Sequence, residues 1–315
     1  MTASIIQGKW RLPDHAIIQA QGADAFHFLH SQLSNAVEGL GRDQARPAAY
    51  CTAQGRLLAN GMFWQHSDTT IQWVVSQDLA EGLVRRLGMF VLRAKVTLTL
   101  EPRWHVWGAT GPQWVPAALH QQPVWSRLDT EGDTWIVAPH SQPHAPAAWC
   151  IRATADPTHA AKAIPNDVDD LASKGAAIWQ AARLDSGWPW IRSSSQDMFL
   201  PSALNMDTNG SIDFKKGCYP GQEVVARSHY RGATKRRMAL GGAVWPDTQE
   251  APAAGSDLFA AGQAQGRPVG RIIEAIATPG RLHVAAEITL TDWPQTTYAI
   301  GNPDGVCLDL TLPKP

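Results

Sequence analysis

The chain has 315 residues and a formal net charge of −1, from 27 basic and 28 acidic residues. Hydrophobic residues make up 44% of the sequence and charged residues 17%, which excludes a disordered chain and a uniformly basic nucleic-acid-binding protein. A chain of this length typically forms about two domains, with room for a small third one.

The first hundred residues alternate between patterns typical of strands and helices. Residues 25–33 and 79–91 have helical spacing, and Leu79, Leu83, Leu87 and Phe90 share one face of the second helix. Strands are predicted at 15–20, 48–52, 56–64, 71–75 and 96–100. This order predicts an antiparallel sheet with helices on one face.

The remainder of the chain divides into three further parts. Residues 102–165 are rich in loops with short strands such as 134–138, and 169–184 form a predicted helix. Short strands at 240–244, 257–260, 269–275 and 283–288, the first of which precedes a linker at 246–256, predict a small β-barrel. We therefore expect an α+β protein with an N-terminal domain (1–101, completed by parts of 166–237), a second α+β core (102–165), a helix and motif segment (166–237) and a C-terminal barrel (238–315).

The cysteines and histidines indicate no metal site. Cys51, Cys150, Cys218 and Cys307 show no CxxC spacing, and the histidines are scattered without ligand spacing. The N-terminus lacks the apolar core of a signal peptide, and no long apolar stretch is present. We expect a cytoplasmic protein without a membrane span, and a monomer by default.

Residues with reactive or charged side chains are most concentrated between positions 214 and 227. Gly217 and Gly221 bracket Cys218 in a tight loop, and helix-forming residues follow from Gln222. A helix N-terminus and the neighbouring Lys216 would both stabilise the thiolate of Cys218. The alternative is that Cys218 is a small buried residue without reactivity.

A basic stretch continues from this loop. Seven cations and one acid, Glu223, lie between residues 215 and 237. The cations are Lys215, Lys216, Arg227, Arg231, Lys235, Arg236 and Arg237. They form either a site for carboxylates or phosphates or a solvated charged surface.

These residues resemble the signature of the YgfZ-type folate-binding family, which is related to the glycine-cleavage aminomethyltransferase (T-protein). The signature reads Lys216, Gly217, Cys218, Tyr219, Pro220, Gly221, Gln222, Glu223, Val224, Val225, Ala226 and Arg227, and residues 230–236 fit its continuation. Weaker matches lie at 22–25, 28–29, 54–56, 93–96, 183–189, 199–201 and 205–207, so the resemblance covers most of the chain.

The resemblance implies a fold, a ligand and a role. The fold is a GcvT-like ring of three domains with a C-terminal barrel, in which the N-terminal domain binds folate in the central hole. The ligand is tetrahydrofolate or a derivative such as 5-formyl- or 5,10-methylene-tetrahydrofolate. The role is support of iron–sulfur enzymes, including those of tRNA thiomethylation, through transient contacts with client proteins and without direct nucleic-acid binding.

The resemblance also assigns site residues. Asp185 matches a carboxylate that binds the pterin in T-protein relatives, and it is the shorter Asp here; the alternative is a local turn bond. The other folate positions are Trp179, Arg183, Asn205 and His15, although Trp179 and His15 are equally compatible with core positions. Arg227 and residues 235–237 would hold the glutamate tail.

One departure from T-protein concerns the transfer chemistry. T-protein carries carboxylates near the folate nitrogen, and Leu58 and Ala59 stand at those positions here. Neither side chain can exchange a proton, so any activity is expected to run through Cys218, with Lys216 beside it.

Three other functions remain open. A folate-dependent aminomethyl transferase or demethylase would need Asp185 or Glu223 as its base. A cysteine hydrolase would pair Cys218 with His229, although such partners usually come from distant segments. An RNA-binding module at 215–237 would have few aromatic residues for stacking.

Overall fold

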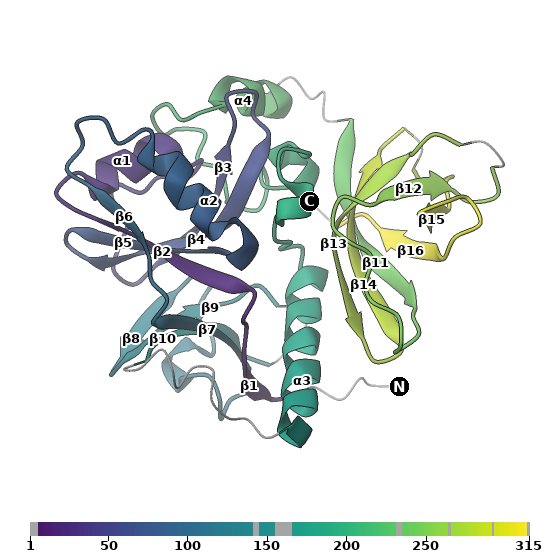
Figure 1. Ribbon diagram of the computed structural model, residues 1–315, viewed down its shortest axis with the longest axis horizontal. Helices are drawn as coiled ribbons and strands as arrows, with labels where there is room; N and C mark the ends of the chain where they lie inside the picture. Colours follow the sequence, from purple (N-terminus) through teal and green to yellow (C-terminus); the bar gives the residue numbers. More distant parts are fainter. Residues whose placement is uncertain are drawn as a thin grey trace.

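Two antiparallel sheets and a closed barrel make up the protein (Figure 1). The computed structural model describes residues 6–140, 145–154, 166–230, 235–263, 266–291 and 293–313. Helix α3 (Asn166–Asp185) runs between the two sheets on one side and the barrel on the other (Figure 1). The predicted class, antiparallel sheets with helices and a C-terminal barrel, is confirmed.

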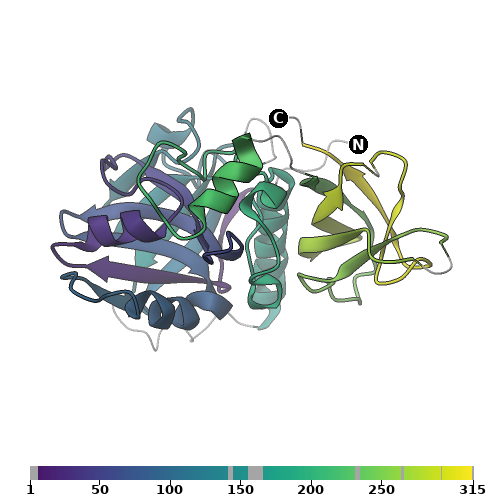
Figure 2. The same ribbon diagram turned by 90° about the horizontal axis from the view of Figure 1, so that it is seen from above.

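The first sheet has the strand order β3-β4-β5-β2-β6. Its strands are β2 (His15–Gln21), β3 (Ala45–Cys51), β4 (Leu57–Ser67), β5 (Thr70–Ser76) and β6 (Thr97–Leu100). Helices α1 (Ala25–Gln32) and α2 (Gln77–Gly88) lie in front of this sheet in Figure 2, with the second sheet behind it. Strand β5 and most of β4 are buried, because both of their faces are covered.

Helix α2 ends earlier than its pattern predicts. The helix stops at Gly88, and Phe90 is 47% exposed instead of extending the buried face of Leu79, Leu83 and Leu87. Glycine is a poor helix former, which explains the early end.

The second sheet has the strand order β1-β7-β10-β9-β8. Its strands are β1 (Gly8–Arg11), β7 (Trp104–Thr110), β8 (Arg127–Thr130), β9 (Asp133–Val137) and β10 (Ala147–Ala153). Strand β1 pairs with β7, so the N-terminal residues join a sheet formed mainly by the middle of the chain.

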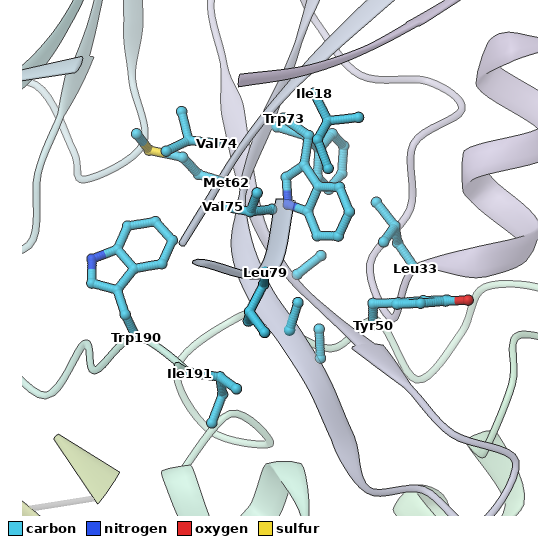
Figure 3. Packing of buried hydrophobic residues seen from close by; sticks show 14 of the residues in the cluster. Ile18, Leu33, Tyr50, Met62, Trp73, Val74, Val75, Leu79, Trp190 and Ile191 are labelled. Carbon is cyan, nitrogen blue, oxygen red and sulfur yellow. The ribbon is translucent and has the colours of Figure 1, made fainter. Parts of the chain in front are cut away.

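The core of the first sheet also includes the segment that follows α3. Figure 3 shows Trp190 and Ile191 beside Met62, Val74 and Leu79. All of these side chains are buried in one cluster. The segment after α3 is therefore an integral part of the N-terminal core.

The closed barrel has the strand order β11-β14-β13-β12-β15-β16. Its strands are β11 (Arg236–Val244), β12 (Asp257–Ala260), β13 (Gly270–Thr278), β14 (Arg281–Thr289), β15 (Tyr298–Ile300) and β16 (Cys307–Thr311). Strands β15 and β16 close it and were not expected from the sequence. Within the described residues, the other helices are α4 (Gln222–Tyr230) and the short 3₁₀ helices Ala117–Leu119, Ser193–Ser195 and Pro201–Leu204.

Candidate functional site

The motif loop is fixed to the end of helix α1 by Lys216. Its ammonium group donates hydrogen bonds to the carbonyl oxygens of His30 and Leu33, the latter at 2.7 Å. These carbonyls belong to the C-terminal end of α1, where a cation is favourable. The same nitrogen lies 4.9 Å from the ring centroid of the buried Tyr219. Burial lowers the pKa of Lys216 to about 8.

Cys218 follows this anchor and is exposed. It differs from Cys51 and Cys150, which are buried and whose pKa values burial raises to about 12 and about 11. Of the two interpretations of Cys218, the small buried residue is thus wrong. An exposed thiol beside a fixed ammonium group is available for chemistry with a partner.

Two glycines hold the loop against the turn between β3 and β4. A Cβ atom on Gly221 would lie 2.4 Å from the carbonyl oxygen of Thr52, and one on Gly55 would lie 3.0 Å from Val224. Both glycines have positive φ angles, 80° and 76°, which other residues adopt only with strain. Residues 54–56, which also match the family, therefore lie against the motif loop in the structure.

The rest of the motif lies on helix α4. Gln222 is its first residue, and the exposed Glu223 accepts a hydrogen bond from Arg227 at 2.7 Å, one turn along. His229 is the residue that a cysteine hydrolase would pair with Cys218, and it has two other contacts. Its ring stacks on that of Phe214 with the centroids 4.1 Å apart, and its Nδ1 atom lies 3.5 Å from Oδ2 of Asp207.

Three of the seven predicted cations, Arg227, Arg236 and Arg237, are paired with carboxylates. Arg236 binds Glu287 at 2.9 Å, and Arg237 binds Asp207 at 2.5 and 2.9 Å. Arg231 and residues 232–234 of the motif's continuation lie outside the described residues. Lys215 and Lys235 are exposed. An anion would therefore meet fewer free cations here than the sequence indicates.

Trp179 and Arg183 are buried along α3. Trp179 is 1% exposed, packs edge-on against Trp149 at 5.6 Å, and donates its indole N–H to Ala109 at 3.3 Å. The guanidinium of Arg183 is completely buried and forms two hydrogen bonds of 2.9 Å with Glu274 of the barrel. Burial alone would raise the pKa of Glu274, but Arg183 and Arg192 outweigh it and keep this pKa below its usual value.

Asp185 is the last residue of α3, and its side chain is 33% exposed. Its Oδ2 atom lies 2.9 Å from Nδ1 of His283 in the barrel. His140 lies close enough to Asp185 to feel its charge, but burial outweighs that effect and lowers the pKa of His140 to about 4. The imidazole of His140 is therefore neutral at pH 7, and its ring lies 6.0 Å from Trp179. Strand β14 of the barrel thus contacts the end of α3, and the segment that follows β9 lies near the same helix.

Asn205 lines a separate cavity of about 410 Å³ together with Ser186, Gly187 and Arg237. Its amide nitrogen lies 3.4 Å from the carbonyl of Met238, and its Oδ1 atom is buried without a hydrogen-bond partner in the described part of the chain. This unpaired acceptor is suited to a ligand with an N–H donor. Because Ser186 directly follows Asp185, the cavity adjoins the end of α3.

His15, Leu58 and Ala59 lie in the N-terminal core. His15 is 6% exposed, lies 2.9 Å from Asp14 and packs edge-on against Trp190 at 4.6 Å. Leu58 and Ala59 are 6% and 0% exposed in β4. The two residues that the resemblance matches to the transferase carboxylates are therefore apolar and buried.

Sequence reasoning missed His140 and His283. Neither has a motif around it: His283 reaches Asp185 only through the packing of the barrel onto α3, and His140 lies beside Trp179 of the same helix. In the described residues, no group of three His, Cys, Asp or Glu side chains is arranged to hold a metal ion. Among the helices that the structure describes, none is long and apolar enough to cross a membrane.

No family model matches the chain. The chain is 28% identical to the tRNA-modifying protein YgfZ of Shigella sonnei over 276 residues, which cover 84% of this chain and 80% of that protein. It is 29% identical to the protein of the same name from Escherichia coli O157:H7 over 273 residues, with the same shares covered. The glycine cleavage system aminomethyltransferase T of Bartonella henselae superposes with a TM-score of 0.65 at 12% identity, over 96% of this chain and 83% of that one. The resemblance expected from the motif is thereby confirmed: in sequence the chain is similar to YgfZ-type tRNA-modifying proteins, and its fold is that of the glycine-cleavage aminomethyltransferases.

Proposed function

We propose that this protein binds tetrahydrofolate, or its 5-formyl or 5,10-methylene derivative, and supports the assembly or maintenance of iron–sulfur enzymes, including those that thiomethylate tRNA. One observation favours an accessory role over aminomethyl transfer. The motif cysteine, Cys218, is exposed, whereas Leu58 and Ala59 replace the transferase carboxylates with buried apolar groups. The name of the similar proteins, which calls them tRNA-modifying, supports the same role.

The end of α3 is the proposed folate site. A pterin presents N–H and amino donors, and the partly exposed carboxylate of Asp185 is an acceptor suited to them. Asn205 lines the adjoining cavity, and its Oδ1 atom, buried without a partner among the described residues, is the second acceptor in this proposal. Trp179, Arg183 and His15 are buried and do not line the adjoining cavity, so in this proposal they support the site from the core. When bound, the folate would supply or accept a one-carbon unit.

The motif loop is the proposed contact with client proteins. Lys216 fixes the loop, and the thiol of Cys218 is the group that a client would meet. Gly217, Tyr219, Gly221, Gln222, Glu223 and Arg227 keep the loop and α4 in shape. In this proposal the protein works in the cytoplasm as a monomer, contacts clients transiently and does not bind nucleic acid directly.

Calorimetric titration with tetrahydrofolate and 5-formyl-tetrahydrofolate tests this proposal. Saturable binding that weakens at least tenfold in Asp185→Ala and persists in Cys218→Ala would support a folate site with a separate thiol. A strain that lacks its own YgfZ-type protein provides the second readout: wild type should restore tRNA thiomethylation and Cys218→Ala should not. Turnover of a methylated amine with tetrahydrofolate would favour the transferase instead, and absence of folate binding at millimolar ligand would overturn the proposal.

A further inference from the structure

The barrel contributes a histidine to the end of α3. His283 lies near the start of β14, and its Nδ1 atom is 2.9 Å from Oδ2 of Asp185. An ionised carboxylate only accepts hydrogen bonds, so Nδ1 of His283 carries the proton and donates it. The contact joins two residues that are distant in sequence and lie in different parts of the fold.

The imidazole ring of His283 is held on both sides. Its Nε2 atom lies 3.2 Å from the hydroxyl of Thr278 at the end of the neighbouring strand, β13. The side chain of His283 is only 15% exposed. A ring with a partner at each nitrogen has one orientation and therefore fixes the carboxylate that it binds.

The contact occupies only part of the Asp185 carboxylate. Oδ2 is bound to His283, while Oδ1 accepts no hydrogen bond from any residue that the structure describes. A carboxylate has about four acceptor positions on its two oxygens. The group is therefore oriented by the barrel and keeps acceptor capacity for a ligand.

The position of the barrel does not depend on His283. Two residues before Asp185, Arg183 forms its buried pair with Glu274 of β13. Glu274 also accepts the backbone N–H of Trp190 at 2.8 Å. Removing the imidazole of His283 should therefore leave the barrel docked and release only the carboxylate.

We propose that His283 is a positioning residue of the folate site: it orients the Asp185 carboxylate toward the pterin donors, and the C-terminal barrel thereby takes part in ligand recognition. This inference rests on the proposed function.

Four variants measured by tetrahydrofolate titration test the proposal. His283→Leu should weaken binding about tenfold, because an unoriented carboxylate loses a charge-assisted contact. His283→Asn keeps an N–H donor near the position of Nδ1 and should bind within about twofold of wild type. Asp185→Ala should weaken binding at least as much as His283→Leu, and the double variant Asp185→Ala/His283→Leu should match Asp185→Ala alone.

The matched control is His105→Leu, which removes a half-buried histidine bound to Arg11 at 3.2 Å in the second sheet. It should leave the dissociation constant unchanged. Thermal melting of every variant reports on folding independently of ligand.

The outcomes separate this inference from the proposed function. Two results would overturn the inference in a wild type that binds folate. One is that the losses of binding free energy from Asp185→Ala and His283→Leu add up in the double variant; the other is that His283→Asn binds as weakly as His283→Leu. Either result would mean that His283 does not act through Asp185. If folded wild type binds no folate, the proposed function fails and this inference fails with it.

Discussion

Gly221 of the motif loop lies against Gly55 of the turn between β3 and β4, so closely that a Cβ atom on Gly221 would stand 2.6 Å from the Cα atom of Gly55. The exposed thiol of Cys218 is thus presented from a loop whose backbone is packed onto the N-terminal sheet. The two matched segments of sequence, 54–56 and the motif, form one structural unit.

The first prediction concerns this contact. Gly221→Ala should destabilise the protein by about 2–4 kcal/mol, because it adds left-handed backbone strain and a clash with the Thr52 carbonyl. Gly210→Ala is the control: Gly210 also has a positive φ, 82°, but open space around it, so only about 1–2 kcal/mol of strain is expected. Urea unfolding measures both, and equal losses would show that the packing at Gly221 contributes nothing.

The second prediction concerns the four thiols. Iodoacetamide should label Cys218 and Cys307 in the folded protein and reach Cys51 and Cys150 only after unfolding, because burial raises the pKa of both buried thiols. Mass spectrometry of peptides gives the rate at each site. Labelling of Cys51 or Cys150 in the folded protein at the rate of Cys218 would contradict the burial of these two thiols.

The sequence predicted the elements that carry a strong periodic pattern and missed those that depend on tertiary contacts. Strand β12 and the start of α4 match the expectation, because their apolar spacing and flanking turns are local signals. Strands β15 and β16 were missed because the first has three residues and the second alternates only two buried side chains with exposed ones.

The same distinction applies to the site. The motif and its glycines are visible as a contiguous pattern, and the structure shows why the glycines are needed. The resemblance predicts a ligand role for Arg183; in the structure its guanidinium binds Glu274, and no sequence signal connects those two residues. His283 likewise reaches Asp185 only because the barrel closes and docks on α3.

The third prediction concerns Lys216. With a pKa of about 8 in the folded protein, its amine should reach half-maximal acetylation rate near pH 8, well below the range of an ordinary lysine. The unfolded chain keeps this lysine protonated up to about pH 10.4. The unfolded state therefore binds more protons between these values, and the contribution of Lys216 to stability rises with pH across that window. A half-maximal rate above pH 9.5 in peptide mass spectrometry would contradict the burial argument.

The last prediction concerns the junction between α3 and the barrel. Glu274→Ala should cost about 3–5 kcal/mol in urea unfolding, because the buried guanidinium of Arg183 would lose its partner. Glu223→Ala, which removes the exposed pair with Arg227, should cost only about 0.5 kcal/mol.

The pH dependence at this junction follows from the lowered pKa of Glu274. The stabilisation that ionised Glu274 gives the folded state is complete above its unfolded pKa near 4.5 and is lost as the pH falls through its lower folded pKa. Wild type should therefore lose stability below about pH 4.5 more steeply than Glu274→Ala. Replacing both Arg183 and Glu274 by Met should recover most of the loss, since neither charge then remains buried and unpaired. A double variant as unstable as Glu274→Ala would mean that the pair also holds the barrel in place through its geometry, beyond the neutralisation of two charges.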